Sequence, residues 1–421
     1  MNRQLSQSRL DSIVLFIALI LANLRATIFV FLHPDVSVLL GPAWIEIAIW
    51  LLLGLAVVYS LARGGTTSEY LSMWRRNWLP ALFILLAFLS TLWSIAPLTT
   101  LFSSLELLVA AMVASYFGMR LASEKLMDAL FWFGALLLIL SIALVFGAPP
   151  TGTMYWPPFN GAWRGVYWHR NHLASVAALL SIVYLCRMYL AVRNRNTSGI
   201  LDAILYLLTL VILYFARSAT GYIVFLVLHG AGMITWVWLQ LEPRLRRWHY
   251  LMVLVGCVLV AILVLSNLDV VFGLFGRDTS MTGRTSLWSN LIGLAARRPW
   301  LGHGFGAVWT LDSFREEIRQ LVGWTSQPLI ADNGLLDIYL HLGITGLVVF
   351  SCVLMVTTVR SLLFGARQKS LAGFFPLVVM VYAFFANITF SLFAETEVFL
   401  WFLIIAGLFM ATPSARKTIT S

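Results

Sequence analysis

The chain has 421 residues, of which 60% are hydrophobic and only 11% are charged. A soluble domain carries about 25% charged and about 45–50% apolar residues. The composition therefore excludes a soluble, disordered, fibrous or disulfide-rich secreted protein and indicates a polytopic membrane protein. The net charge of +10 does not indicate a nucleic-acid partner, because the basic residues follow the ends of apolar stretches.

Twelve stretches of the chain approach the length of about 20 apolar residues that a helix needs to cross a bilayer. They cover residues 12–32, 43–62, 78–95, 98–119, 127–147, 172–192, 200–216, 219–241, 249–271, 334–359, 371–391 and 397–413. The first stretch lacks a clear signal-peptide cleavage site and is expected to be retained. The sequence predicts an all-α polytopic membrane protein with about 12 transmembrane helices, one integral membrane domain over residues 1–421. Two hairpins with very short turns would also allow about ten to fourteen spans.

Basic residues near the ends of these stretches predict their orientation, because Lys and Arg are enriched in cytoplasmic loops. With a cytoplasmic N-terminus, 18 of the 28 basic residues fall on the cytoplasmic side. These are Arg3, Arg9, Arg63, Arg75, Arg76, Arg120, Lys125, Arg187, Arg193, Arg195, Arg244, Arg246, Arg247, Arg360, Arg367, Lys369, Arg416 and Lys417. We therefore expect both termini to be cytoplasmic.

The basic residues on the other side are all arginines: Arg25, Arg164, Arg170, Arg217, Arg277, Arg284, Arg297, Arg298, Arg315 and Arg319. The guanidinium fork fits phosphate and carboxylate in a bidentate manner. Nearly all of these arginines lie in two non-cytoplasmic loops, 148–171 and 272–333. Loops longer than about 12–15 residues are usually functional, so the pattern indicates an anion site on the outer side.

The first loop ends in a run of aromatic and basic residues that includes Trp163, Arg164, Trp168, His169 and Arg170. Aromatic rings of this kind stack on sugar faces while cations hold a phosphate. The same composition is also typical of an interfacial belt at the lipid headgroups, and both interpretations stay open at this point.

The second loop contains an amphipathic pattern over 286–298, three alternating glycines (Gly302, Gly304 and Gly306), and a charged segment over 312–322. The spacing predicts a helix on the outer membrane boundary, and the charged segment predicts a short surface helix. The glycines allow either an anion-binding nest of backbone N–H groups or a simple flexible turn.

Two further residues lie at the outer ends of spans. Arg217 occupies the turn between 200–216 and 219–241, where an arginine faces a cavity or snorkels to the interface. Asp332 precedes the stretch 334–359, where it would either cap that helix or act as a general base.

The sequence offers no metal or nucleotide site. His169 and His172 have the i, i+3 spacing of metal ligands but no third ligand near them in sequence. Asp-x-Asp, the phosphate loop and the Gly-x-Ser-x-Gly elbow are all absent from the chain. We therefore expect neither a cofactor nor a metal.

Taken in order, five motifs resemble the O-antigen ligase and exopolysaccharide polymerase superfamily, and are most similar to exopolysaccharide polymerases of the succinoglycan type. They are WRGVYWHRNHLAS, RSATG, GRTSLW, RRPWLGHGFGAVW and DNGLLDIYLHLGITGL. The resemblance covers about residues 150–350 by motif.

This resemblance implies a metal-independent glycosyltransferase of the bacterial inner membrane, with the periplasmic loop 272–333 lying over the active site. Such enzymes transfer a glycan from a polyprenyl diphosphate to an acceptor sugar hydroxyl. Arginines of the family hold the diphosphate, and the matching positions here are Arg217, Arg284 and, by motif alone, Arg164. Relatives carry His-Asn where this chain has Asp332-Asn333, so Asp332, or else His303, would take the role of the base.

The predicted catalytic residues are accordingly Asp332, Arg284 and Arg217. The predicted substrate-binding residues are Arg164, Arg170, His169, His303, Asn333, Trp163, Trp168 and Trp309, with the three tryptophans as sugar platforms. The expected partners are a polyprenyl-diphosphate-linked glycan, an acceptor glycan and the lipid bilayer, together with flippase and chain-length regulator proteins.

Three other functions remain compatible with the sequence. A ligase would pass a finished glycan to a lipid or protein hydroxyl and differs only in its acceptor. A transporter of an anionic substrate would show inverted repeats and broken midplane helices, which the sequence does not show clearly. A peptidoglycan polymerase of the shape, elongation and division type has a comparable architecture but different motifs.

Overall fold

The computed structural model describes residues 2–23, 44–155, 159–241, 284–323, 330–389, 391 and 398–413. Within these ranges the chain is helical, and the only β pairing is an isolated antiparallel bridge between Thr153 and Trp163. The predicted all-α class is therefore confirmed.

The helices differ in length, and their bounds follow in chain order. They are α1 (Asn2–Ala22), α4 (Trp44–Gly64), α5 (Thr67–Arg76), α6 (Trp78–Leu89), α7 (Pro97–Arg120), α8 (Ser123–Gly147), α9 (Pro149–Gly152), α10 (Arg170–Arg193), α11 (Gly199–Ala216), α12 (Ala219–Gln240), α15 (Arg284–Ala295), α16 (Asp312–Val322), α17 (Gly334–Gln368), α18 (Phe375–Thr389) and α19 (Phe399–Met410). Three short 3-10 turns, η1 (Ser90–Leu92), η3 (Val308–Thr310) and η4 (Ala372–Phe374), lie between them.

Seven of the described helices are long and apolar enough to cross a membrane, and four shorter apolar helices accompany them. The chain is thus a multi-pass membrane protein, as its composition indicated. The expected span 249–271 and the end of 12–32 lie outside the described residues.

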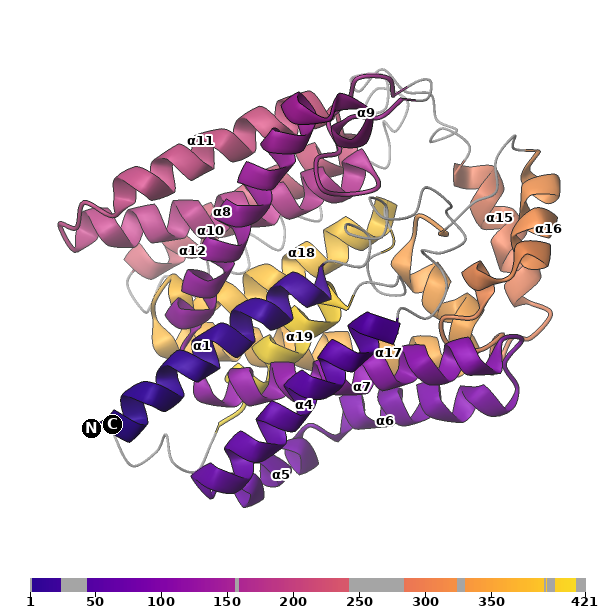
Figure 1. Cartoon of the computed structure of the whole chain (residues 1–421), viewed down its shortest axis with the longest axis horizontal. Coiled ribbons are helices and arrows are strands. Elements are labelled where there is room, and N and C mark those ends of the chain that lie inside the picture. Colours follow the sequence, from indigo (N-terminus) through magenta and orange to yellow (C-terminus); the bar gives the residue numbers. More distant parts are fainter. Residues whose placement is uncertain are drawn as a thin grey trace.

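The helices form one elongated bundle with two distinct ends (Figure 1). The start of α1 and helix α5 lie at one end, and α9, α15 and α16 lie at the other. Hydrogen bonds from Ser123 to Met410 and from Asn77 to Thr412 tie the first end together. Among the arginines predicted to lie on the outer side, Arg284 begins α15 and Arg315 and Arg319 lie on α16, at the second end. Arg75 and Arg76, predicted to be cytoplasmic, lie on α5 at the first end.

Helix α10 forms the buried centre of its half of the bundle and packs on α8, α11 and α12. Small residues on α10 permit this close approach, as they do between membrane helices in general. A Cβ atom on Gly221 of α12, for example, would lie 2.4 Å from the Cβ of Ala174. The start of α12 is therefore fixed against the start of α10.

Helix α17 is broken at Gly343, where the backbone has φ 64° and ψ −165°. The break leaves carbonyl and N–H groups without partners inside the helix, and residues 299–304 supply them. The backbone N–H groups of His303 and Gly304 donate to the carbonyls of Leu340 and His341, at 3.0 and 2.9 Å. On the other side of the break, the N–H groups of 344 and 345 donate to the carbonyls of 299 and 300.

The predicted helices 286–298 and 312–322 are present as α15 and α16, and α16 has the predicted bounds. The apolar face of α15 packs on α16 and α17. Leu287, Leu291 and Leu294 are buried there, whereas Ile292 is exposed. Protein therefore covers most of this apolar face, and the position of the helix at the outer membrane boundary stays a prediction.

Candidate active site at the outer end of the bundle

The first residues of α15 and the residues that precede α17 meet in an ion pair. The Nε atom of Arg284 donates to Oδ2 of Asp332 at 3.0 Å. The side chain of Arg284 is 8% exposed and that of Asp332 is 24% exposed. Two of the three predicted catalytic residues, 48 positions apart in the chain, are therefore in direct contact.

The backbone around Asp332 is fixed from both sides. Trp288 Nε1 donates to the carbonyl of Ala331 at 2.8 Å, and the N–H of Asn333 donates to the hydroxyl oxygen of Ser391 at 3.0 Å. Asp332 itself has φ +54°, a left-handed conformation that costs energy for a residue other than glycine and that clusters at functional sites. The surrounding hydrogen bonds thus hold the backbone of Asp332 in a left-handed conformation that a residue other than glycine rarely adopts, and this fixes where its carboxylate begins.

Asn333, and not Asp332, caps α17. Its Oδ1 atom accepts from the N–H groups of Leu335 and Leu336, each at 3.1 Å. The capping role considered for Asp332 is therefore filled by its neighbour, which leaves the Asp332 carboxylate for its ion pair. The cap engages the side-chain oxygen of Asn333.

The guanidinium of Arg284 is held at Nε alone. Within the described residues, its terminal nitrogens Nη1 and Nη2 donate to no group, and Oδ1 of Asp332 accepts from none. An arginine oriented through Nε presents Nη1 and Nη2 in one plane, the arrangement that binds two oxygens of a phosphate.

His169 connects the first loop to this pair. It precedes α10 as its N-cap, and its Nδ1 atom accepts from the N–H of Asn171 at 3.2 Å. Desolvation, together with the charges of Arg170, Arg284 and Arg164, lowers the pKa of His169 to about 3. These charges act on one imidazole only because the two outer loops converge, and the imidazole is neutral at physiological pH.

Arg164 and Arg170 use their donors within the protein. Arg164 is buried and donates from Nε to the carbonyl of Thr151 at 2.8 Å, with weaker bonds to two other carbonyls of its loop. Burial lowers the pKa of this guanidinium. Arg170 donates from Nη1 to the carbonyl of Arg217, and its guanidinium lies 4.0 Å from the centroid of the Phe159 ring. Both arginines hold the loop in place and add positive charge near Arg284. We call Arg164, Arg170, Arg217 and Arg284 the arginine cluster.

Arg217 is the C-cap of α11 and has φ +49°. Its side chain is exposed, whereas its carbonyl accepts from Arg170. The next residue, Ser218, caps α12 and donates to Oδ1 of Asn171 at 2.9 Å. The turn that carries Arg217 is thus fastened to the start of α10, at the rim of the arginine cluster.

The three predicted sugar platforms differ in exposure. Trp163 stacks on Phe215 with ring centroids 4.5 Å apart, and Trp168 is half-buried beside His169. Trp309 is buried and donates from Nε1 to Oδ1 of Asp337 at 2.7 Å. A sugar can therefore reach Trp168 more readily than Trp309.

The glycine loop serves the fold of α17 and is not an anion nest. Its first N–H groups donate to the carbonyls at the α17 break, and the N–H of Phe305 donates to the hydroxyl of Ser90 at 3.1 Å. His303 is buried, and its Nδ1 lies 3.1 Å from the carbonyl of Leu340. Burial lowers its pKa, and the charges that act on it come from Arg298, Arg297 and Glu317. His303 therefore lies outside the arginine cluster.

Asp337 is a buried carboxylate that the sequence analysis did not single out. It accepts from Trp309, and its N–H donates to the carbonyl of Asn333 at 3.0 Å. The sequence signal for it was an acidic residue one helical turn after the cap, in an otherwise apolar stretch. Such an acid is expected to be buried, and a buried acid needs a hydrogen-bond donor. It fixes the first turn of α17 to η3.

Within the described ranges, no group of three or more His, Cys, Asp or Glu side chains is placed to hold a metal ion. The ionic groups that meet at this site are the arginines and Asp332.

Comparison with known proteins gives two similarities that include the residues of this site. Residues 204–351 match the family model described as O-antigen ligase, a range that contains Arg217, Arg284 and Asp332. The exopolysaccharide production protein ExoQ of Rhizobium meliloti (strain 1021) is 24% identical over 286 residues, which cover 65% of this chain. The matched region spans 62% of the length of that relative.

Proposed function

We propose that this multi-pass membrane protein, which is similar to O-antigen ligases and to an exopolysaccharide production protein, polymerises polyprenyl-diphosphate-linked oligosaccharide repeats into an exopolysaccharide. The donor would be the carrier-linked glycan, and the acceptor would be a sugar hydroxyl of a second glycan. We place this reaction on the periplasmic side of a bacterial inner membrane, with both termini cytoplasmic and the arginine cluster outermost.

The observation that carries this proposal is the pair of terminal nitrogens on Arg284, oriented by the Nε bond to Asp332. Cleavage of the sugar–phosphate bond builds negative charge on the departing diphosphate. Donors placed in advance where charge develops stabilise the transition state. Arg284 would contact the diphosphate, and the exposed side chain of Arg217 would reach it from the rim of the cluster.

In the proposed reaction, the acceptor hydroxyl oxygen bonds to the anomeric carbon while the bond from that carbon to the diphosphate oxygen breaks. The hydroxyl proton goes to Oδ1 of Asp332, and the diphosphate leaves on its carrier. Because Arg284 holds Oδ2, the carboxylate is both charged and oriented, so its second oxygen can act as the base. No step needs a metal ion.

The ligase is the second candidate function, because it differs only in the acceptor and the matched family model is that of O-antigen ligases. A flippase would supply the donor, and a chain-length regulator would limit the product, in either case.

The test uses purified full-length protein in nanodiscs with a polyprenyl-diphosphate-linked oligosaccharide in the presence of EDTA. Products are followed by gel electrophoresis and mass spectrometry, with Arg284→Ala and Asp332→Ala measured alongside. We expect longer carrier-linked glycans to form with the wild type and to be absent with both variants.

Other outcomes would change the assignment. Product that forms only after a lipid or peptide acceptor is added would identify a ligase. Product that EDTA abolishes would contradict the metal-independent mechanism. No product under either condition, together with carrier-independent uptake of an anionic glycan into vesicles, would identify a transporter.

A further inference from the structure

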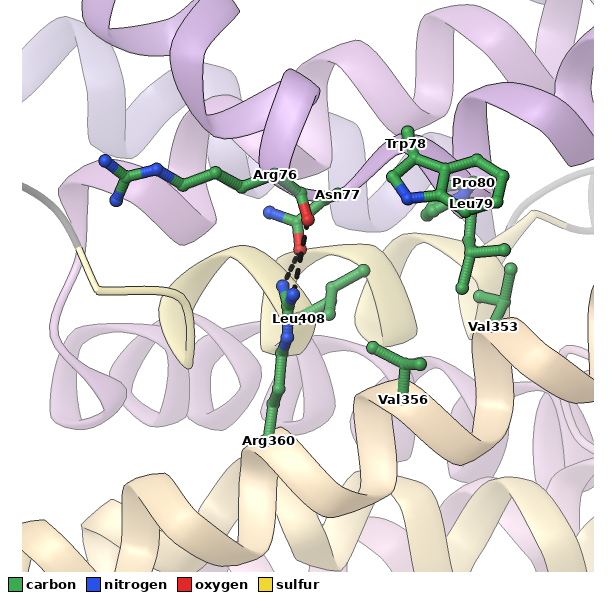
Figure 2. Close-up of a pocket in the computed structure, with 9 residues that line it drawn as sticks. All are labelled: Arg76, Asn77, Trp78, Leu79, Pro80, Val353, Val356, Arg360 and Leu408. Carbon is green, nitrogen blue, oxygen red and sulfur yellow. Dashed lines mark hydrogen bonds between the residues drawn. The ribbon is translucent and has the colours of Figure 1, made fainter.

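A pocket lies at the end of the bundle opposite the Arg284–Asp332 pair, between the start of α6, the later half of α17 and α19 (Figure 2). A second pocket of about 510 Å³ adjoins it at the end of α17 and just after α19. Arg76 and Arg360 line both, so the two form one continuous region. None of the residues that line it belongs to the candidate active site.

Three arginines give this region an uncompensated positive charge. Arg76 and Arg360 lie on both pockets, and Arg367 lines the second. In the part of the chain that the structure describes, none of the three forms an ion pair with a carboxylate, whereas Arg187 and Arg284 each do. A concave surface of one sign with low-dielectric walls concentrates ions of the opposite sign, so the region attracts an anion.

One of these arginines is held in position by the protein. Figure 2 shows Arg360 reaching across the pocket from α17 toward Asn77. It donates to the side chain of Asn77, to the hydroxyl of Thr412 at 3.2 Å and to the carbonyl of Arg76 at 3.2 Å. The side chains of Arg76 and Arg367 are exposed. Arg76 donates from Nη1 to the carbonyl of Pro413 at 2.9 Å, at the surface of the region.

The other part of the pocket wall is apolar. Figure 2 shows Arg76 extending to one side of Arg360, and Trp78, Leu79, Val353 and Val356 lying on the other side. Trp78 is 58% exposed, at the place along the bundle where the charged end gives way to apolar helix surface. Trp at such a position is typical of the membrane–water interface.

We propose that this region binds an anionic phospholipid of the leaflet at this end of the bundle. The phosphate lies among Arg76, Arg360 and Arg367, and the upper part of an acyl chain lies along Trp78 and Val356. Basic pockets between helix ends are a known form of lipid headgroup recognition. A free phosphate would use the arginines but would leave the apolar wall uncovered.

Native mass spectrometry of the full-length protein in detergent tests this proposal, with phosphatidylglycerol and phosphatidylcholine of identical acyl chains as the probes. We expect phosphatidylglycerol to bind about 100-fold more tightly, roughly fivefold for each of the three arginines. In the double variant Arg76→Gln/Arg367→Gln the preference falls by roughly fivefold for each arginine removed. The bonds of Arg360 involve neither replaced side chain. The one hydrogen bond lost, from Arg76 Nη1 to the carbonyl of Pro413, is exposed, so the variant is expected to melt close to the wild-type temperature without added lipid.

Arg63→Gln is the matched control, because Arg63 is a basic residue of α4 that lines neither pocket and donates to Tyr59. It should bind phosphatidylglycerol as the wild type does. If the double variant melts early, Arg367→Gln alone is measured, since the side chain of Arg367 makes no hydrogen bond in the described residues.

Equal affinity for the two lipids, or unchanged phosphatidylglycerol binding in the arginine variants, would overturn the proposal. So would displacement of phosphatidylglycerol by an equal concentration of inorganic phosphate, which would show a site for a free anion. These measurements use no glycan substrate, so their result is independent of the proposed enzymatic function.

Discussion

The ion pair between Arg284 and Asp332 brings together the two groups that the proposed reaction needs, a cation for the diphosphate and a base for the acceptor hydroxyl. A nearly buried arginine with one nitrogen engaged and two directed elsewhere binds an oxyanion without first having to be ordered. The carboxylate compensates the charge of Arg284 before the substrate arrives, which limits the desolvation cost of a buried cation. Each residue therefore depends on the other for its orientation.

Replacement of Asp332 by Asn separates the base from the positioning role. Asn keeps an oxygen that accepts from Arg284 Nε, but it cannot take a proton. If Asp332 is the base, the turnover number of Asp332→Asn should fall about 100-fold or more, while binding of the carrier diphosphate changes little. Parallel measurement of turnover and of carrier binding checks this. A variant with near-wild-type turnover would restrict Asp332 to positioning Arg284.

His169 predicts a pH dependence of stability. Its pKa is lowered to about 3 in the folded protein from about 6.5 in the unfolded chain, so between these values the unfolded chain binds the extra proton. The free energy of unfolding should therefore fall as the pH is lowered from about 6.5 toward 3. Thermal melting of the purified protein at pH 7 and pH 5 measures this loss.

The matched variant for this prediction is His169→Asn. Asn is a good N-cap residue, so it preserves the bond to the N–H of Asn171 but does not titrate. Its melting temperature should fall less between pH 7 and pH 5 than that of the wild type. An equal fall in the melting temperature of both proteins would contradict the assignment of the stability lost at low pH to His169.

Among single residues, the sequence could identify the outer-side arginines but not the different contacts that each of them makes. Arg164, Arg170 and Arg284 look alike as outer-side arginines, and family motifs favour two of the three without separating their roles. Only the fold shows that Arg164 and Arg170 donate to carbonyls of nearby loops while Arg284 donates from Nε to Asp332. Such partners are set by loop closure, which has no local signature.

At the scale of elements, the break in α17 determines how the loop 299–306 packs at the end that carries α15 and α16. The loop 299–306 crosses the break and replaces the missing helical hydrogen bonds. Gly302 allows this crossing, because it has φ +66° and a Cβ atom there would lie 2.5 Å from the carbonyl carbon of His341. The loop and α17 therefore form one unit that supports Asp332.

The substitution Gly302→Ala should weaken the contact between the loop 299–306 and the break in α17. We expect the free energy of unfolding to fall by about 2 kcal/mol or more, from positive-φ strain and the backbone clash together. Gly293→Ala is the control, since Gly293 lies in helix α15 with open space at its Cβ position and should be neutral or slightly stabilising. Thermal unfolding in detergent compares the two, and equal stability would contradict the proposed crossing.

Helix positions could be read from hydrophobic runs, and most described spans follow them closely. Two differ: α1 begins at Asn2, well before the predicted start at 12, and α17 continues to Gln368, past the predicted end at 359. The break in α17 could not, because Gly343 lies inside an apolar run that reads as one continuous span. Nor could the packing of α15, since an amphipathic face looks the same whether bilayer or protein covers it. Both features depend on partners that are distant in the chain.

The whole molecule separates its basic residues between two ends, and this predicts its orientation. We expect Arg319, on α16, to face the periplasm and Arg75, on α5, to face the cytoplasm. In a variant without the three native cysteines, Arg319→Cys should react with a membrane-impermeant maleimide in intact cells. Arg75→Cys should react only after the membrane is opened. The reverse labelling pattern would contradict the orientation.

Sequence alone predicted the bundle, the two loops and the family, but not how the loops meet. His169 and Arg284 are separated by several spans, and nothing local to either predicts that they share one site. The lipid-binding region at the opposite end is likewise built from three separate helix ends. Both sites follow from the closure of the bundle.

The measurement that tests the central claim most directly is the turnover of Arg284→Lys on a polyprenyl-diphosphate-linked oligosaccharide. Lysine keeps the charge and the contact with Asp332 but cannot present two donors in one plane. Arg319→Lys, a change on the surface of α16 where Arg319 pairs with Glu316, serves as the control. We expect a loss of about 100-fold or more for Arg284→Lys, an unchanged melting temperature, and near-wild-type turnover for the control. Full polymer formation by a correctly folded Arg284→Lys protein would contradict the role of Arg284 in holding the diphosphate.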